Sequence, residues 1–144
     1  MADTYILLVD DEVPFVETMT KRLTKRGLKV TSSLSGEKAL QMIDSHRNLD
    51  VVILDVKMPG MDGVQTLQEI KKRFPLIEVI MLTGHATVES AVEGMKLGAY
   101  DYLMKPCDID ELISKVQAAV NQKREHEQRI RDAAVKNALS TSFD

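Results

Sequence analysis

The stretch Val51-Val52-Ile53-Leu54-Asp55 determines the fold class, because four consecutive apolar residues end abruptly at a carboxylate. A short, uninterrupted apolar run rich in β-branched residues is typical of a strand that is buried on both faces of a sheet. Such strands occur mainly in parallel sheets that helices cover on both sides. We therefore expect the rest of the chain to supply further parallel strands and the helices between them.

Apolar runs of the same kind recur on both sides of this stretch. The five predicted strands are Tyr5–Val9, a weaker Lys29–Ser33, Val51–Leu54, Ile77–Leu82 and Tyr102–Met104. Apolar residues at helical spacing follow each strand and predict a helix after it. Five β-α units in series predict an α/β fold, a doubly wound parallel sheet with helices on both faces.

Local signals mark the starts of several of these helices. Pro14 suits a first helical turn, where its missing N–H has no partner to lose. Ser35 is a suitable N-cap for the next helix. Asp108, followed three residues later by Glu111, resembles a capping box in which Asp takes the Ser/Thr role.

The composition limits the class of protein. A chain of 144 residues with 44% hydrophobic and 28% charged residues suggests one globular domain with at most a short appendage. The net charge of -3 argues against a general nucleic-acid binder, and no apolar run approaches the ~20 residues of a membrane span. A single cysteine, Cys107, excludes an internal disulfide and a multi-thiolate zinc site. With no secretory signal at the N-terminus, a reducing, cytoplasmic setting is expected.

Residues 123–144 differ from residues 1–122, which we expect to form the domain itself. Charged residues dominate the start of this extension, and a seam at heptad spacing enters it from the last predicted helix. The seam consists of Ile109, Leu112, Val116, Ala119, Lys123, His126, Ile130 and Ala133. Lys123 and His126 weaken it as a coiled coil. Three interpretations stay open: a solvated helix that frays, a dimer helix, and a linker to a further domain.

The functional signal is the position of polar residues at the strand ends. Four of the five predicted strands end in such residues, namely Asp10, Asp11, Asp55, Thr83 and Lys105. In an open parallel sheet, ligands bind beyond the carboxyl ends of the strands. We therefore expect these five side chains to share one site.

The charge of this site suggests a metal ion. Three carboxylates contribute -3 and Lys105 contributes +1, so a hard divalent cation would bring the sum to zero. Oxygen ligands with open positions suit Mg²⁺, which commonly acts beside phosphate. A carboxylate is also a competent nucleophile that forms an aspartyl phosphate, and phosphoryl transfer needs mainly positioning and charge neutralisation.

Each residue also has a simpler explanation. Asp10 or Asp11 is a suitable helix cap, and Asp55 is a suitable turn residue. Thr83 fits an ordinary strand exit, and Lys105 is by default a solvated surface lysine. All five explanations would have to coincide at one edge of the sheet, so a shared site is the favoured interpretation.

Four segments together resemble the response-regulator receiver family, the CheY-like domains of two-component signalling. They are V-D-D-E (9–12), V-I-L-D-V-K-M-P-G-M-D-G (52–63), V-I-M-L-T-G (79–84) and G-A-Y-D-Y-L-M-K-P (98–106). The resemblance covers roughly residues 4–122. It implies a flavodoxin-like strand order, 2-1-3-4-5.

The resemblance also implies a role for each matching residue of the site. Asp55 corresponds to the phosphoacceptor. Asp10 and Asp11, with Asp55 and the backbone carbonyl of Lys57, correspond to the group that binds Mg²⁺. Thr83 and Lys105 correspond to the residues that contact the phosphoryl group.

Further matching positions concern switching and phosphoryl lifetime. Tyr102 corresponds to the switch aromatic, whose rotamer tracks the position of Thr83. Lys105-Pro106 matches the family's cis peptide bond, for which X-Pro is the plausible chemical setting. Lys57 and His85 match variable positions that tune phosphoryl lifetime, although a solvated loop residue is the first expectation for His85.

The implied function is a phosphorylation-controlled signalling switch rather than a dedicated enzyme. The phosphoryl donor would be a histidine kinase or a histidine phosphotransfer protein, and the output would reach a downstream effector domain or protein. The fourth helix, fifth strand and fifth helix are the expected output face, and this face or the C-terminal helix would support a homodimer. The segment G-H-A-T-V-E-S-A-V (84–92) is similar to receivers of NtrC-type transcriptional activators.

Three other functions compete with this one. An aspartyl phosphohydrolase of the haloacid-dehalogenase type would place D-x-D after its nucleophile strand, whereas this chain has Asp55-Val56-Lys57. A flavodoxin-like cofactor binder would need a phosphate loop where Asp10, Asp11 and Glu12 would repel a phosphate. A degenerate receiver would act as a phosphorylation-independent interaction module.

Overall fold

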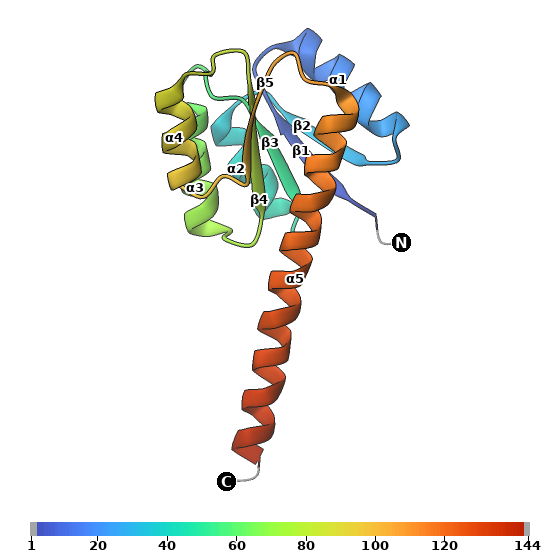
Figure 1. Ribbon diagram of the computed structural model, residues 1–144, viewed down its shortest axis with the longest axis vertical. Coiled ribbons are helices and arrows are strands. Elements are labelled where there is room, and N and C mark those ends of the chain that lie inside the picture. The colour runs from blue at the N-terminus through green and yellow to red at the C-terminus, as the bar shows by residue number, and fades with distance from the viewer. Residues whose placement is uncertain (1–2, 143–144) are drawn as a thin grey trace.

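A computed structural model describes residues 3–142, which form a five-stranded parallel sheet between two layers of helices (Figure 1). The strands are β1 (Tyr5–Val9), β2 (Lys29–Ser33), β3 (Val51–Leu54), β4 (Glu78–Thr83) and β5 (Asp101–Met104). Their order in the sheet is β2-β1-β3-β4-β5, and every neighbouring pair is parallel. The predicted α/β class and strand order are therefore confirmed.

The register of the strands brings their carboxyl ends to one edge of the sheet. Val9 is level with Leu54, which is in turn level with Met81. Backbone hydrogen bonds continue the alignment just past the strands, from Asp55 N to Val9 O at 2.9 Å and from Lys105 N to Thr83 O at 2.9 Å. The residues that follow the strands therefore meet at this edge.

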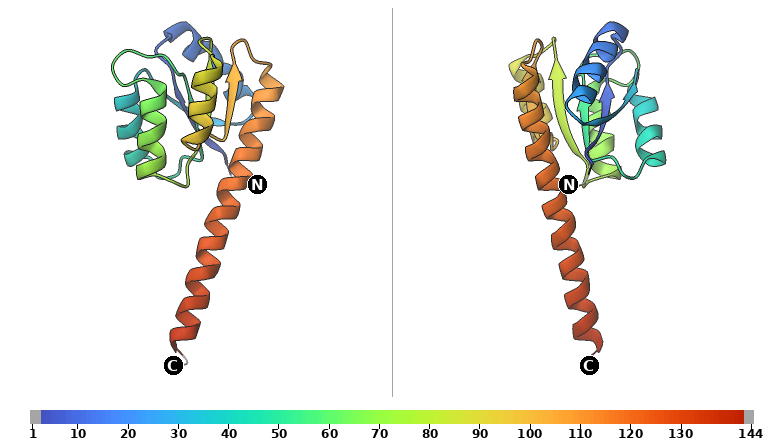
Figure 2. Two further views of the ribbon diagram at one scale, coloured as in Figure 1. Left: turned by 60° about the vertical axis from the view of Figure 1, so that its left-hand side comes forward. Right: turned by 90° about the vertical axis from the view of Figure 1, so that its right-hand side faces the viewer.

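Two layers of helices cover the sheet, as alternation along each strand requires (Figure 2). The helices are α1 (Val13–Lys25), α2 (Gly36–Ser45), α3 (Gly63–Arg73), α4 (Val88–Lys96) and α5 (Ile109–Ser142). Leu7, Val52 and Val79 belong to the core on the α2 and α3 side. Ile6, Ile53 and Ile80 belong to the core with α1 and α5. The strands β1, β3 and β4 are thus apolar on both faces.

The predicted capping residues act as expected, with one difference. Pro14 lies in the first turn of α1, and Ser35 accepts a hydrogen bond from Lys38 N at 3.2 Å. Asp108 accepts from the backbone N–H of Asp110 and of Glu111, at 2.8 and 3.3 Å. Within the described residues, no return bond runs from the Glu111 side chain, so Asp108 caps α5 without the full box.

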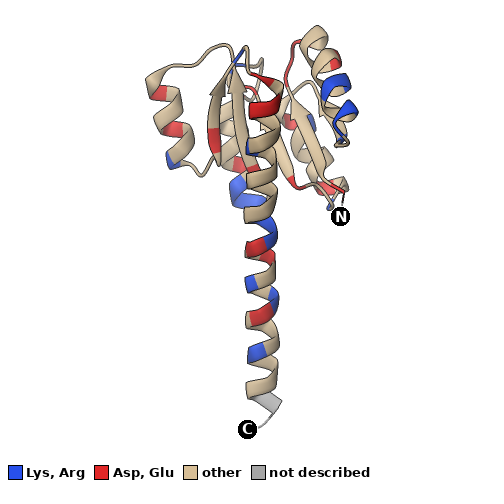
Figure 3. Cartoon of the chain, turned by 45° about the vertical axis from the view of Figure 1, so that its right-hand side comes forward, with Lys and Arg blue, Asp and Glu red and all other residues tan. Residues whose placement is uncertain are grey.

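Helix α5 continues well past the sheet as one uninterrupted helix (Figures 1 and 2). In the first half of α5, the residues of the heptad seam pack into the core of the domain. Leu112, Val116 and Ala119 are buried against the sheet. Further along, Ile130 is 56% exposed. Basic and acidic residues are interspersed along this projecting part (Figure 3), and the last two residues of the expected extension, 143–144, lie outside the described residues.

Three polar residues hold α5 where it passes the opposite edge of the sheet. Lys123 is buried and places its Nζ 3.3 Å from Asp50 Oδ1. Arg124 lies 3.6 Å from the other oxygen of Asp50, and Gln122 donates to Glu78 Oε2 at 3.0 Å. We call these five residues the helix clamp. Lys123, which weakens the seam as a coiled coil, is therefore buried because it pairs within its own domain.

Candidate functional site

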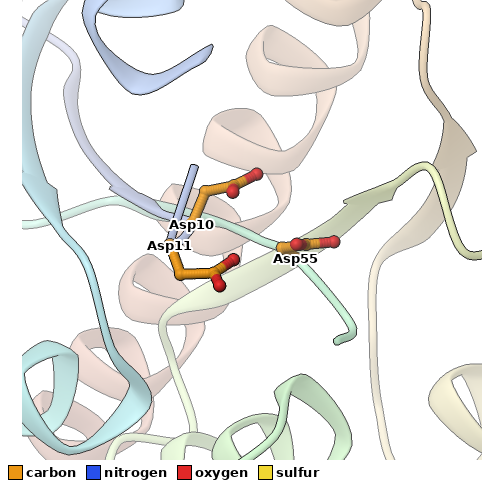
Figure 4. A group of neighbouring side chains, drawn as sticks. All are labelled: Asp10, Asp11 and Asp55. Atoms are coloured by element: carbon orange, nitrogen blue, oxygen red, sulfur yellow. The ribbon is translucent and has the colours of Figure 1, made fainter. Parts of the chain in front are cut away.

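Three carboxylates converge beyond the carboxyl ends of β1 and β3 (Figure 4). Asp10, Asp11 and Asp55 each offer an oxygen, and these oxygens all lie within 4.8 Å of one another. Asp10 and Asp55 are buried, whereas Asp11 is exposed. The structure therefore brings together the three acidic residues that the sequence predicted at one site.

Asp55 is a buried member of this cluster with one carboxylate oxygen that lacks a hydrogen-bond partner among the described residues. Its side chain follows β3 directly, and the residue is 2% exposed. The Oδ1 atom accepts a hydrogen bond from Val56 N at 2.9 Å, but the buried Oδ2 atom has no hydrogen-bond partner among the described residues. A buried carboxylate oxygen without a partner is costly, and such a group in a native fold calls for an explanation in function.

The backbone behind Asp55 is packed too tightly for any residue but glycine at position 63. A Cβ added to Gly63 would lie 2.0 Å from the carbonyl oxygen of Asp55. Gly63 N also donates to Val56 O at 2.6 Å, which closes the loop between β3 and α3. The start of α3 therefore fixes the backbone that carries Asp55.

Asp10 links the acidic cluster to Lys105. One oxygen of Asp10 accepts from Glu12 N at 2.9 Å, and the other lies 2.6 Å from Lys105 Nζ. Burial raises the pKa of Asp10, with a further contribution from the charge of Asp55, although the hydrogen bond from Lys105 opposes the shift. The N-cap of α1 is Glu12 rather than Asp10, so the simple capping explanation for Asp10 is wrong.

Lys105 is not a solvated surface lysine, because its side chain is only 13% exposed. Its ammonium contacts Asp10 and also Glu12, at 3.4 Å. Burial alone would lower the pKa of Lys105, but the hydrogen bond to Asp10 and the nearby negative charges outweigh burial and raise it. Lys105 therefore carries a positive charge at the rim of the acidic cluster. The Lys105–Pro106 peptide bond is cis, as the resemblance implies.

Thr83 ends β4, the strand next to β3, and is fully buried. Its hydroxyl oxygen accepts a hydrogen bond from His85 N at 3.0 Å, which leaves the hydroxyl proton free to be donated. His85 itself is exposed, as expected for a loop residue, and Lys57 is exposed in the loop after β3. The structure thus places Thr83 at the same edge as Asp55, with His85 and Lys57 on the surface nearby.

Tyr102 on β5 connects this edge to the start of α4. Its hydroxyl lies 2.6 Å from Ser90 Oγ, and the residue is half-buried. Ser90 also forms a capping box with Thr87, in which each side chain bonds the other residue's backbone. A hydrogen bond therefore links the Tyr102 side chain to the first turn of α4.

Comparison with known proteins identifies the family. The response regulator receiver domain family matches residues 6–117, most of the chain. The chain belongs to the response-regulator receiver domain family. The DNA-binding transcriptional regulator NtrC of Klebsiella pneumoniae is 38% identical over 121 residues, which make up 84% of this chain and 26% of that protein. The transcriptional regulatory protein ZraR of Escherichia coli O157:H7 is 41% identical over 115 residues, with coverage of 80% and 26%.

Solved structures agree with this assignment. A response regulator receiver domain protein from Clostridium thermocellum superposes with a TM-score of 0.80 at 36% identity, covering 84% of this chain and 97% of that chain. The receiver domain of NtrX from Brucella abortus gives a TM-score of 0.75 at 36% identity, covering 81% and 98%. The receiver spans about a quarter of the length of the curated relatives named above.

The acidic cluster of the receiver fits Mg²⁺ by its chemistry. All three side chains supply carboxylate oxygens, which are the ligands that hard cations prefer. One of these oxygens is buried without a hydrogen-bond partner among the described residues, so a cation there would satisfy it. Two positive charges would also offset the mutual repulsion of Asp10, Asp11 and Asp55.

Four residues that contact the site were not among the site residues predicted from the sequence. Phe15 is one of the apolar residues at helical spacing after the first strand and has nothing in the sequence to mark it for the site, yet Lys105 Nζ lies 3.8 Å from its ring centroid. Glu12 pairs with Lys105, and Ser90 pairs with Tyr102. Glu37 accepts a hydrogen bond from Met61 N at 2.9 Å, in the loop that follows Asp55. Only Glu12 had a signal in the sequence, its position directly after Asp10-Asp11.

Within the described residues, no helix is both long and apolar enough to span a membrane.

Proposed function

We propose that this receiver accepts a phosphoryl group on Asp55 from a histidine kinase or a histidine phosphotransfer protein. The observation that carries the proposal is that Asp55, a member of the acidic cluster, is buried with an Oδ2 atom that has no hydrogen-bond partner among the described residues. Because the fold makes no hydrogen bond to this oxygen, the carboxylate can bind Mg²⁺ through one oxygen and act as a nucleophile through the other.

In the proposed reaction, an oxygen of Asp55 forms a bond to phosphorus while the bond from phosphorus to the donor's imidazole nitrogen breaks. The electron pair of that bond leaves with the imidazole, which then takes up a proton. Lys105 supplies a positive charge beside the phosphoryl oxygens, and the Thr83 hydroxyl supplies a hydrogen-bond donor. We expect self-phosphorylation from small donors and slow loss of the phosphoryl group to be the only chemistry of the chain.

The Mg²⁺ ligands in this proposal are Asp10, Asp11, Asp55 and the backbone carbonyl of Lys57. The ion would neutralise charge on the phosphoryl group and the carboxylates. The protein's own contribution is to hold the side chains in place, because the register of β1 and β3 fixes where Asp10 and Asp55 leave the sheet.

Phosphorylation adds negative charge at one edge of the sheet, and we propose that Thr83 and Tyr102 respond to it. Thr83 can donate its hydroxyl proton to the phosphoryl group while its oxygen still accepts from His85 N, so a movement of Thr83 toward the phosphoryl group would draw the backbone of His85 with it. The loop of residues 84–87 leads into α4, and a hydrogen bond between the hydroxyls of Ser90 and Tyr102 joins the first turn of α4 to β5. Lys57 and His85, exposed beside the site, are proposed to tune the phosphoryl lifetime.

The partners proposed for this chain follow from its relatives. NtrC and ZraR are transcriptional regulators by name, so a downstream effector in transcription is the proposed output, in the cytoplasm. The α4, β5 and α5 face carries the exposed side chains of Val92, Met95 and Met104, which suit a protein partner. A homodimer through this face or through the projecting part of α5 is also proposed, and light scattering over a range of concentrations would test it.

The test is the intact mass of the protein after incubation with acetyl phosphate, with and without Mg²⁺. We expect one added phosphoryl group in wild type with Mg²⁺, and none when Mg²⁺ is chelated or when Asp55→Asn is used. Asp44→Asn is the matched control, because Asp44 is an exposed aspartate at the end of α2. It should be phosphorylated like wild type.

No added mass in a folded wild-type protein that binds Mg²⁺ would contradict the proposal. The chain would then be a degenerate receiver that acts through its surface alone. Addition that persists in Asp55→Asn would instead show that another residue is the acceptor. Family membership already favours a receiver over a haloacid-dehalogenase-type phosphohydrolase or a flavodoxin-like cofactor binder.

A further inference from the structure

The ammonium group of Lys105 is held from one segment, the end of β1 and the first turn of α1. Asp10 Oδ2 lies 2.6 Å from Lys105 Nζ, and Glu12 Oε1 lies 3.4 Å away. The third contact is the ring of Phe15, whose centroid lies 3.8 Å from the same nitrogen. At this distance the negative face of an aromatic ring attracts a cation.

Two of these three partners attract the ammonium of Lys105 only weakly once Mg²⁺ is bound. Asp10 would be shared with the metal, so its carboxylate has less negative charge to offer Lys105. The Glu12 side chain is 58% exposed, and ion pairs in contact with water contribute little. A phenyl ring is no ligand for a hard cation, so Mg²⁺ does not compete with Lys105 for the ring of Phe15.

Phe15 is partly buried and is anchored by packing. It lies in the first turn of α1, directly after Pro14, and is packed against the core that α1 and α5 share with the sheet. Its neighbour Val16 is buried in the same core. The ring is therefore anchored to the core of the domain, beside which it contacts Lys105.

We infer that Phe15 is a positioning residue that keeps the ammonium of Lys105 beside the acidic cluster when Mg²⁺ occupies Asp10. The inference rests on the proposed function, since it assigns Phe15 to the phosphoryl transfer at Asp55. Phe15 acts through Lys105 and does not touch the reacting atoms.

The first experiment compares phosphorylation of Phe15→Leu and Phe15→Tyr with wild type. Leu keeps an apolar side chain but removes the ring, whereas Tyr keeps the ring. We expect the rate at saturating acetyl phosphate and Mg²⁺ to fall roughly tenfold in Phe15→Leu and to return to near wild type in Phe15→Tyr. The affinity for Mg²⁺ should be the same in all three proteins, because Phe15 is no metal ligand.

Met19→Leu is the control for packing, since Met19 is a buried residue of α1, one helical turn beyond Phe15, without a role at the site. Urea unfolding shows whether each variant is folded under the assay conditions. A Phe15→Leu protein that is phosphorylated at the wild-type rate would overturn the inference. So would a loss of rate in Met19→Leu that matches the loss in Phe15→Leu.

The second experiment needs no phosphorylation. Protons above an aromatic ring resonate upfield, so the Cε protons of Lys105 report their distance from Phe15 in an NMR spectrum, with Lys105→Arg used to assign them. We expect the upfield shift to persist in Mg²⁺-saturated wild type and to vanish in Phe15→Leu. A shift that disappears when Mg²⁺ binds to wild type would overturn the inference.

The two experiments separate the two claims. A wild-type protein that takes up no phosphoryl group would refute the proposed function, whatever Phe15 does. The NMR signal would still decide whether Phe15 holds Lys105 in the Mg²⁺-bound protein.

Discussion

The unpartnered oxygen of Asp55 has a cost in stability as well as the proposed use in chemistry. Asp55 is buried between the backbone of the β3–α3 loop and two other aspartates. Three like charges within 4.8 Å of one another repel, and the desolvated Oδ2 atom gains nothing in return. A site of this kind is one where activity and stability oppose each other.

The first prediction is that Asp55→Asn stabilises the protein when Mg²⁺ is absent. The substitution removes one of three negative charges and introduces an amide that can donate to a neighbouring carboxylate. The free energy of unfolding should rise by about 1 kcal/mol, measured by urea unfolding with a chelator present.

Mg²⁺ should reverse the order of stability, so that wild type becomes more stable than Asp55→Asn. Binding to the native state alone stabilises it, by about 2.7 kcal/mol at a concentration one hundred times the dissociation constant. Wild type should show this gain, and Asp55→Asn should show much less of it. If Asp55→Asn is less stable than wild type without Mg²⁺, the three carboxylates do not destabilise the native state.

The second prediction concerns Glu37, which fixes the loop after Asp55 from a neighbouring helix. The backbone N–H of Met61 donates to Glu37 and lowers the pKa of its carboxyl group, with help from the N–H of Glu37 itself. The bond from Met61 N to the ionised Glu37 therefore stabilises the native state in full above pH 4.5, the ordinary pKa of a Glu carboxyl group. This stabilisation is lost as the pH falls through the lowered pKa of Glu37.

An NMR titration of the Met61 amide tests this prediction. Its shift should change with a midpoint below 4.5, because a protonated Glu37 accepts the hydrogen bond less strongly. In Glu37→Gln the same step should be absent. A Met61 amide that does not respond between about pH 6 and about pH 3 would show that the contact does not form in solution.

At the scale of elements, the start of α4 depends on a strand that follows it in the chain. Ser90 takes part in the capping box with Thr87 and bonds the hydroxyl of Tyr102 on β5. Most of α4 is exposed, and Gly94 is its only buried residue. Few apolar contacts anchor this helix, so its first turn depends strongly on these side-chain bonds.

The third prediction follows from this arrangement. Ser90→Ala removes the hydrogen bond from Thr87 N and the link to Tyr102, while Thr87 still caps the helix through the backbone N–H of residue 90, so amide exchange in the first turn of α4 should quicken by an amount equivalent to about 1 kcal/mol. Tyr102→Phe removes the link alone and should have a smaller effect in the same direction. If amide exchange of α4 in Tyr102→Phe equals that of wild type, the hydroxyl does not couple β5 to α4.

At the scale of the whole molecule, the helix clamp determines where α5 leaves the domain. Asp50 lies just before β3, also accepts a hydrogen bond from Tyr5 N at 2.9 Å, and pairs with Lys123 and Arg124. The clamp therefore joins α5 to the amino ends of β1, β3 and β4, at the edge opposite the acidic cluster. The boundary expected after residue 122 falls within this contact region.

The fourth prediction distinguishes the two halves of the clamp. Asp50→Ala leaves the buried Lys123 with only Glu127 as an ion-pair partner among the described residues, so the free energy of unfolding should fall by about 3 kcal/mol. Lys123→Met replaces the buried charge by an apolar side chain while Asp50 keeps Arg124 and Tyr5 N, and should cost much less.

Urea unfolding of the two variants provides the comparison. Arg129→Met, on the exposed part of α5, is a matched control that should leave stability unchanged. Equal losses of unfolding free energy in Asp50→Ala and Lys123→Met would mean that the lost attraction of the ion pair, rather than a buried charge left without its partner, accounts for the destabilisation. A truncation that tests the projecting part of α5 should therefore end beyond Arg124, so that the clamp stays intact.

The amino-acid sequence by itself determined the α/β class, the five strands and the set of polar residues at their carboxyl ends. These features are local, since each depends on apolar periodicity and on the residue that ends a run. The boundaries shifted slightly where hydrogen bonding decided them. β4 begins at Glu78 because Ile77 N bonds Phe74 O at 3.1 Å, and β5 begins at Asp101.

Only the tertiary structure decided which of these polar groups are paired and which are left unpaired. The bond from Lys105 to Asp10 joins residues 95 positions apart, and that from Lys123 to Asp50 joins residues 73 positions apart. Such contacts depend on how β1 and β3 sit against β5 and α5, which no short window of sequence encodes. For the same reason, the heptad spacing placed Lys123 only on a seam and no local signal marked Phe15, whereas packing in the folded protein brings each of them against a charged group.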